Sequence, residues 1–253
     1  MIDTHAHIDD EQYSENIAEY IKEQQACGVE KILIPCVDLL SLRRLSSLCD
    51  EYSDYLLPAI GLHPEEVRED YMSVLNEMES LLDSRKWVGI GEIGLDYHFD
   101  KTYVLEQQLA FRRQLDWALS RDLPVMVHNR DATEDCLSIL EEYTSRGLRG
   151  VMHCFSGSHE TAERVVDMGM YLGIGGVITF KNCKLSEHLR GIGIEHILTE
   201  TDSPYMSPVP HRGKRNESRW MSYVISELSK VYGISEDEVD RITTTNAKRL
   251  FRL

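Results

Sequence analysis

Long apolar runs are missing from this sequence of 253 residues: no stretch approaches the roughly 20 residues that a membrane-spanning helix requires. No basic segment followed by an apolar one precedes the first histidines, so no signal peptide is predicted. The six cysteines are scattered and form no C-x-x-C pair. This argues against a disulfide framework and against a zinc site of the cysteine type. We therefore expect a cytoplasmic protein with reduced thiols and no membrane partner.

Positive charge is also scarce. The chain has 43 acidic residues against 27 Lys and Arg, which gives a formal net charge of −16. Such a surface repels a polyanion at long range, which argues against a protein that binds extended nucleic-acid tracts. The charge is compatible with a small site for one phosphate or one strand end, because a bound metal pair can reverse the field there.

The sequence has no low-complexity linker and no Pro/Gly-rich break, so we expect one domain that spans residues 1–253. Short runs rich in Val, Ile and Leu are typical of buried parallel strands, and helical periodicity separates them. They are residues 1–2, 31–37, 56–61, 87–91, 123–127, 150–152, 170–174 and 196–198. Ser235 and Glu238 form a capping-box pattern before a last helix. This α/β pattern predicts a (β/α)8 TIM barrel with an extra C-terminal helix, with a doubly wound open sheet as the main alternative.

Metal-competent side chains follow the predicted strands. The first strand runs into THAH, and five later strand ends carry one such residue each: His63, Glu92, His128, His153 and Asp202. In a closed barrel the carboxyl ends of the strands meet at one mouth, where barrel enzymes place their chemistry. A single histidine at a strand end more often has a structural role, but the joint pattern predicts a metal site.

The H-x-H spacing of His5 and His7 is typical of paired metal ligands. Residues two apart on a strand point to the same side, so this pair can hold one divalent ion, completed by Asp202 from the last strand. His128 and His153 can hold a second ion. Glu92 is then placed to bridge the two ions with its two oxygens.

The segments THAHID, GLHP, GEIGLDYH, HNRDA, HCFSGS, TDSPY, PHRGKRNE and TNAKRLF resemble, in this order, the TatD family of metal-dependent deoxyribonucleases. The resemblance runs from residue 3 to about residue 252. It implies a cytoplasmic TIM-barrel hydrolase of the amidohydrolase type that acts on DNA with divalent metals. It also implies metal ligands that agree with those from the strand ends: His5, His7, Glu92, His128, His153 and Asp202. One departure is Ser218, which stands where the family usually has proline.

We expect a deoxyribonuclease that uses a water activated between two divalent ions to attack phosphorus. Asp202 is the expected catalytic group that accepts the proton of this water and returns it to the leaving oxygen. Glu92 is expected to fix the spacing of the ions. Because the chain has few cations, we expect exonucleolytic action on single strands or strand ends.

Residues around the predicted mouth are expected to support this chemistry. Asp3 and Glu200 each lie two residues before a ligand and could orient the ligand imidazoles. Phosphate contacts are expected from His63, Arg130, Lys181 and Arg215. Stacking on a base is a candidate role for Tyr97, Phe155 and Tyr205.

Two other functions fit the same residues. One is a hydrolase of the same fold that acts on an ester or amide, such as an aminoacyl ester on transfer RNA, because activated water attacks carbon as well as phosphorus. The other is a non-catalytic protein with structural metals, although six ligands over two ions leave open positions. Mixed imidazole and carboxylate ligands suit Zn, Mn, Fe or Ni, while Mg can also serve. No obligate protein partner is evident.

Overall fold

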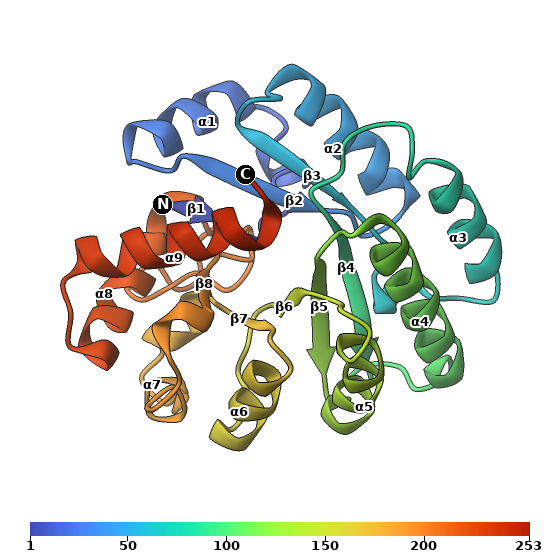
Figure 1. The fold of residues 1–253 in the computed structure, drawn as a ribbon. Helices are drawn as coiled ribbons and strands as arrows, with labels where there is room; N and C mark the ends of the chain where they lie inside the picture. The colour runs from blue at the N-terminus through green and yellow to red at the C-terminus, as the bar shows by residue number, and fades with distance from the viewer.

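Eight parallel strands form a barrel in the computed structural model, which describes residues 1–253 (Figure 1). They are β1 (Ile2–Asp3), β2 (Lys31–Pro35), β3 (Leu56–Ile60), β4 (Gly89–Asp96), β5 (Val125–Arg130), β6 (Gly150–Met152), β7 (Tyr171–Ile174) and β8 (Ile197–Thr199). Each strand pairs in parallel with the next along the chain, in the order β1 to β8. This order confirms the predicted TIM barrel and excludes a doubly wound sheet, in which the strand order reverses.

The barrel closes where the segment after β1 meets β8. The backbone N–H of Thr4 donates to the carbonyl of Thr199 at 3.2 Å. Ala6 and Ser203 form an isolated parallel bridge just beyond the ends of the two strands. The first and the last strands of the barrel therefore share one hydrogen-bonded seam, which brings the N-terminal histidines beside β8.

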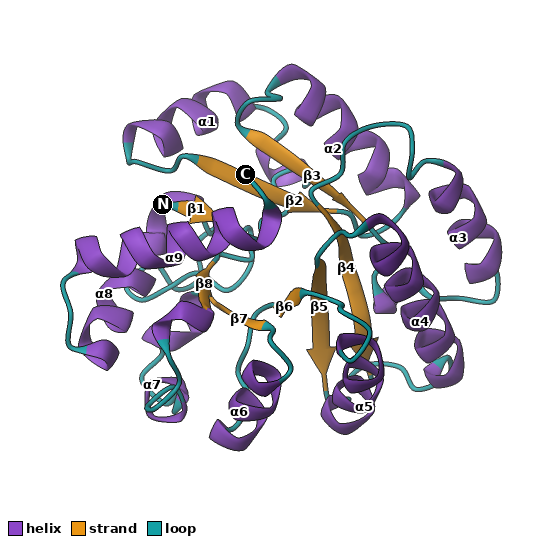
Figure 2. Cartoon of the chain, viewed as in Figure 1, coloured by secondary structure: helices purple, strands orange, loops and turns teal.

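Helices cover the outside of the barrel (Figure 2). They are α1 (Ile17–Ala26), α2 (Leu39–Glu51), α3 (Tyr71–Ser80), α4 (Val104–Arg121), α5 (Thr133–Thr144), α6 (His159–Asp167), α7 (Leu185–His188), α8 (Met221–Tyr232) and α9 (Glu236–Phe251). The last of these is the predicted extra helix. Its cap forms only in part, because the Ser235 hydroxyl accepts the N–H of Glu238 whereas the Glu238 carboxylate pairs with Arg241. No helix combines the length and apolar character that crossing a bilayer would take.

The apolar core has two parts. A cluster of 55 buried residues lies mainly between the strands and the surrounding helices. A second cluster of ten fills the amino end of the barrel and continues into α9: Ile2, Leu33, Ala59, Val88, Met126, Val151, Leu198, Ala247, Leu250 and Phe251. The amino end is therefore packed and covered by α9, and the carboxyl ends of the strands are left to carry polar groups.

Candidate metal centre

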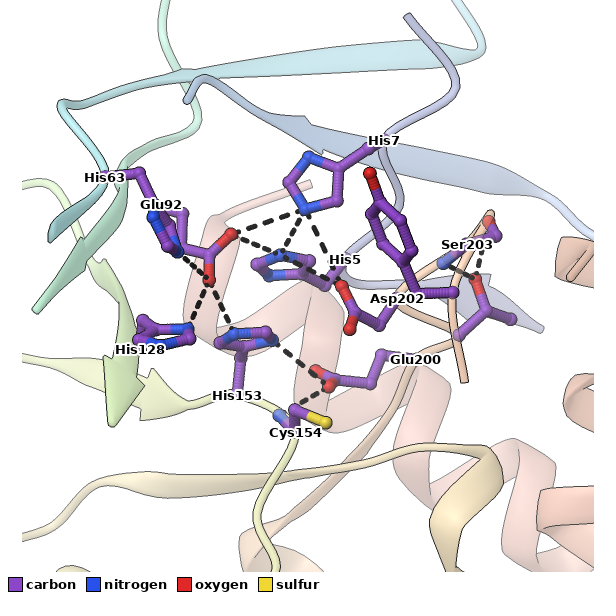
Figure 3. Close-up of polar contacts among 12 residues, drawn as sticks. His5, His7, His63, Glu92, His128, His153, Cys154, Glu200, Asp202 and Ser203 are labelled. Carbon is purple, nitrogen blue, oxygen red and sulfur yellow. Dashed lines mark hydrogen bonds and ion pairs between the residues drawn. The ribbon is translucent and has the colours of Figure 1, made fainter. Parts of the chain in front are cut away.

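The six predicted ligands meet at the carboxyl ends of the strands (Figure 3). Two follow β1, one lies in β4, one lies in β5, and one follows each of β6 and β8: His5, His7, Glu92, His128, His153 and Asp202. All are buried or nearly so. Strand ends far apart in the sequence thus deliver these side chains to one place.

Glu92 is the centre of this cluster. Its Oε2 lies 3.1 Å from His5 Nε2 and 3.3 Å from His7 Nε2. Its Oε1 lies 2.7 Å from His153 Nε2 and 2.9 Å from His128 Nδ1. His63 Nε2 also lies 3.2 Å from Oε1, so the carboxylate stands between two groups of imidazoles.

Asp202 stands at the more open side of the cluster. Its Oδ1 lies 3.6 Å from His7 Nε2 and 3.9 Å from His5 Nε2. Its side chain is 16% exposed, against 3% for Glu92. The backbone of Asp202 has a φ of 55°, a left-handed conformation that is uncommon outside glycine. Asp202 is thus the carboxylate best placed to meet a group that enters from solvent.

The donor atoms suit divalent cations. His5 Nε2 and His7 Nε2 lie only 3.2 Å apart. Three overlapping groups bring their donor atoms within 4.8 Å of one another: His5, His7 and Glu92; His5, His153 and Asp202; and His63, Glu92 and His128. Lone pairs that converge in this way can be shared by a cation or by protons. Imidazole and carboxylate together are ligands that Zn and other transition metals favour.

Charge within the cluster shifts the pKa values in opposite directions. Burial by itself would raise the pKa of Glu92, but the neighbouring histidines His153, His63 and His5 hold it well below its ordinary value. Burial would lower the pKa of His128, but hydrogen bonds to Asp96 and Glu92 raise it to about 9. Imidazolium protons therefore balance the carboxylates when no metal is bound, and a metal ion would have to displace them.

Glu200 lies behind His153. Its Oε1 accepts the backbone N–H of Cys154 at 2.6 Å and lies 3.5 Å from His153 Nδ1. Gly173 in β7 makes room for this carboxylate, because a Cβ there would come within 2.2 Å of Glu200 Oε2. The placement supports the predicted role of Glu200 in orienting an imidazole.

Asp3 does not form its predicted contact with an imidazole. Its Oδ1 accepts the backbone N–H groups of His5 at 3.3 Å and Thr201 at 3.0 Å. Its Oδ2 accepts the Thr201 hydroxyl at 2.6 Å. Asp3 faces the seam with β8, so it holds the backbone that carries His5 rather than the ring.

His63 faces Glu92, and its expected contact with a phosphate stays a prediction. Its Nε2 lies 3.2 Å from Glu92 Oε1, and its Nδ1 accepts the backbone N–H of Glu65 at 3.1 Å. His63 therefore lies against the same Glu92 oxygen as His128 and His153.

Asp96 is a site residue that the sequence analysis missed. Its Oδ2 lies 2.8 Å from His128 Nε2, and its Oδ1 accepts the backbone N–H of His98 at 2.8 Å. The Gln107 amide pairs with both backbone groups of Asp96, at 2.9 and 3.0 Å. Asp96 thus holds His128 with Nδ1 turned towards Glu92. The spacing of four residues between Glu92 and Asp96 could have indicated this role, because residues an even number apart on a strand face the same side.

The three basic residues predicted to bind phosphate lie apart from the cluster. The Arg215 guanidinium stacks 4.4 Å from the Tyr13 ring centre and lines a cavity of about 580 Å³. The other charged residues of that cavity are Glu11, Glu15, Glu19 and Glu23, which would repel a phosphate. Arg130 lies 4.6 Å from the Phe99 ring centre, and Lys181 is exposed. No contact ties any of the three to the candidate ligands.

Two of the three candidate stacking residues are already engaged. Phe155 is buried in the core. The Tyr97 hydroxyl donates to Asp135 at 3.0 Å and accepts from Gln108 at 2.9 Å. Tyr205 remains available, because it is 54% exposed and its ring centre lies 6.3 Å from that of His7.

The model of the TatD-related DNase family matches residues 2–252. This protein belongs to the TatD family. The TatD-family chain is 41% identical to the uncharacterized metal-dependent hydrolase YabD of Bacillus subtilis, over all of this chain and 99% of that one. It is 29% identical to the 3′-5′ ssDNA/RNA exonuclease TatD of Pantoea ananatis, over 100% of both chains. The crystal structure of YJJV, a TatD homologue from Escherichia coli, superposes with a TM-score of 0.94 at 30% identity, covering 100% of this chain and 98% of that one.

These likenesses and the ligand cluster define the protein as a metal-dependent hydrolase of the TatD family with a TIM-barrel fold. Its His, Glu and Asp groups are able to bind metal.

Proposed function

We propose that this TatD-family protein is a divalent-metal-dependent deoxyribonuclease that removes nucleotides from single strands or strand ends. The observation that carries the proposal is the convergence of four imidazoles and two carboxylates at the barrel mouth. The relative from Pantoea ananatis, named as a 3′-5′ ssDNA/RNA exonuclease, supports this class of substrate.

Two divalent ions would be held by the imidazoles on the two sides of the Glu92 carboxylate, with His5 and His7 at Oε2 and His128 and His153 at Oε1. Bound there, such ions supply Lewis acidity towards phosphoryl oxygens and favour ionised water near neutral pH. Glu92 holds the two pairs at a constant separation. Behind the ligands, Asp96 holds His128 and Glu200 holds the segment that carries His153.

Asp202 is the residue that moves protons. Burial raises the pKa of its carboxyl to about 6, which is closer to neutrality than an ordinary aspartate. Such a group can accept a proton from the attacking water and return it within one cycle. The water oxygen bonds to phosphorus, the bond from phosphorus to the leaving nucleoside oxygen breaks, and Asp202 delivers the proton to that oxygen.

The preference for strand ends follows from the charge around the site. The formal net charge is −16, and Arg130, Lys181 and Arg215 do not contact the cluster. Few cations thus stand beside the candidate ligands to hold successive phosphates, and such contacts supply most of the affinity of proteins that bind long nucleic acid. A free end needs to place only the reacting phosphate in the site.

The proposal is tested with pure protein whose metal content has been measured by elemental analysis. The substrates are a single-stranded DNA labelled at one end or the other, its closed circular form, an RNA of the same sequence and an aminoacyl ester. We expect mononucleotides to be released from linear single strands, with the closed circle resistant. Equal rates of hydrolysis on the closed circular DNA and on the linear DNA would contradict action at strand ends. Hydrolysis of the aminoacyl ester alone would contradict the nuclease.

A further inference from the structure

A second cavity lies beside the candidate metal centre. It has a volume of about 240 Å³, and its lining residues come from the segment after β3, from the end of β4, from the segment between β4 and α4, and from the start of α4. Asp96 lines this cavity and is the residue whose carboxylate lies 2.8 Å from His128 Nε2. A group bound in the cavity is therefore separated from a candidate ligand by one side chain.

The most exposed aromatic ring of the region lines this cavity. Phe99 is 74% exposed, although a ring of this size normally avoids water. The Arg130 guanidinium covers one face of the ring at 4.6 Å from its centre, and His98 approaches edge-on at 4.6 Å. His98 is itself held by Asp131 at 2.7 Å. Arg130 and His98 thus hold the Phe99 ring in place, and the rest of its surface is open to a ligand.

The rim of the cavity is unsuited to a phosphate. Glu65, Glu66 and Asp100 place three carboxylates around it, and Arg68 is its single cation. Carboxylates accept hydrogen bonds from ring N–H and exocyclic amino groups, as they do from cytosine N4. The volume is also below the roughly 300 Å³ at which pockets for drug-sized ligands begin, so it suits one planar heterocycle.

We propose that this cavity, with Phe99 as its stacking surface, binds the base of a nucleotide next to the scissile phosphate. This inference rests on the proposed nuclease function and adds the recognition of a base to it. Base–aromatic stacking tolerates every base, because each has a flat π face. Phe99 therefore serves as a binding residue that holds a single strand in place without contacts to its backbone.

The test compares Phe99→Ala with the wild-type enzyme on matched oligonucleotides. One carries all its bases, and two others lack the base on one or the other side of the scissile bond. We expect one abasic substrate to lose roughly tenfold or more in kcat/KM with the wild type, as for removal of one stacked base. Phe99→Ala should show the same loss on the intact substrate and no further loss on that abasic one. Phe99→Tyr should restore the rate.

Leu105→Ala is the matched control, because Leu105 in α4 is also apolar and 63% exposed but does not line the cavity. It should behave as the wild type. Bound metal, measured by elemental analysis, should be equal in all four proteins, so that a loss of rate is not a loss of metal. Equal kcat/KM of wild type and Phe99→Ala on the intact strand, or full rates on both abasic strands, would overturn the stacking role. Failure of the wild type to cleave any phosphodiester would instead contradict the proposed nuclease.

Discussion

The two ends of the barrel are built from the same strands with opposite kinds of side chain. At the amino end, Met126 of β5 and Val151 next to it in β6 belong to the apolar cluster beneath α9. Two residues further along each strand, His128 and His153 contact Glu92 at the mouth. Because a step of two keeps a side chain on the same face, both members of each pair point into the barrel.

β8 and the segment after it show the same gradient at three positions. Leu198 belongs to the apolar cluster, Glu200 supports the segment of His153, and Asp202 reaches the open side of the metal centre. Stability and chemistry are thus separated along the axis of one barrel. Changes at the two ends should therefore have different consequences, and four measurements can test this separation.

The largest effect is expected at the mouth. Asp202→Asn keeps the size of the side chain but removes the proton acceptor, so hydrolysis should fall by about 10²- to 10⁴-fold. The melting temperature should change little, because the side chain lies at the open side of the cluster. Asp167→Asn, an exposed aspartate at the end of α6, is the control. Near-full activity of Asp202→Asn would show that it acts as a ligand only.

The opposite pattern is expected at the amino end. Phe251 at the end of α9 is 4% exposed and belongs to the apolar cluster. Phe251→Ala should lower the free energy of unfolding by about 3–5 kcal/mol, as measured by urea denaturation. The activity of each folded molecule should be unchanged. If Phe251→Ala also bound less metal at a low temperature at which it is folded, the amino end and the mouth of the barrel would not be independent.

A pair of glycines tests the layer between the two ends. A Cβ at Gly173 would lie 2.2 Å from Glu200 Oε2, whereas a Cβ at Gly175 would meet its nearest atom, Glu200 O, at 3.6 Å. Gly173→Ala should displace Glu200 from behind His153 and reduce metal affinity by about 10- to 100-fold. Gly175→Ala should bind metal as the wild type does. Equal affinities for both variants would refute the orienting role of Glu200.

The smallest effect is a pH dependence confined to the mouth. The pKa of His128 is raised from 6.5 to about 9 in the folded protein, so its stabilising contribution is complete below pH 6.5 and is lost as pH rises through 9. The chelated protein should therefore melt at lower temperature as pH is raised across this range. Bound metal should reduce the loss, because an ion takes the place of the proton.

The control for this pH profile is His128→Asn, in which the decline between pH 6.5 and 9 should become shallower. His196→Gln, at a half-buried position next to β8, should retain the wild-type profile. An unchanged slope in His128→Asn would assign the pH dependence to another group.

The barrel and the meeting of the six candidate ligands could be predicted because both depend on local patterns. Apolar runs mark the strands, and the residue at each strand end has only one mouth to enter once the barrel closes. His5 and His7 add the period of two that places both on one side. These features require no knowledge of how any two side chains touch.

Contacts across strands could not be predicted in this way. β4 was expected to end at residue 91, but it runs to Asp96 with a shift of register between Ile90 and Ile93. This extension places Asp96 against His128, whereas the sequence suggested a turn there. The contacts of His63 and Asp3 could not be predicted either, because they depend on which ring nitrogen or backbone group a neighbouring segment presents.

The hydrogen bonds that close the barrel run through the same short segment that carries His5 and His7. His7 donates its backbone N–H to Ser203, and Asp202 donates its own to the carbonyl of His5. A cation bound by both His7 and Asp202 would therefore link the segment after β1 to the segment after β8 and stabilise the closure of the barrel. Metal binding should therefore slow hydrogen exchange at the backbone amides of His7 and Asp202, so the exchange rate at this seam measures the occupancy of the candidate metal centre.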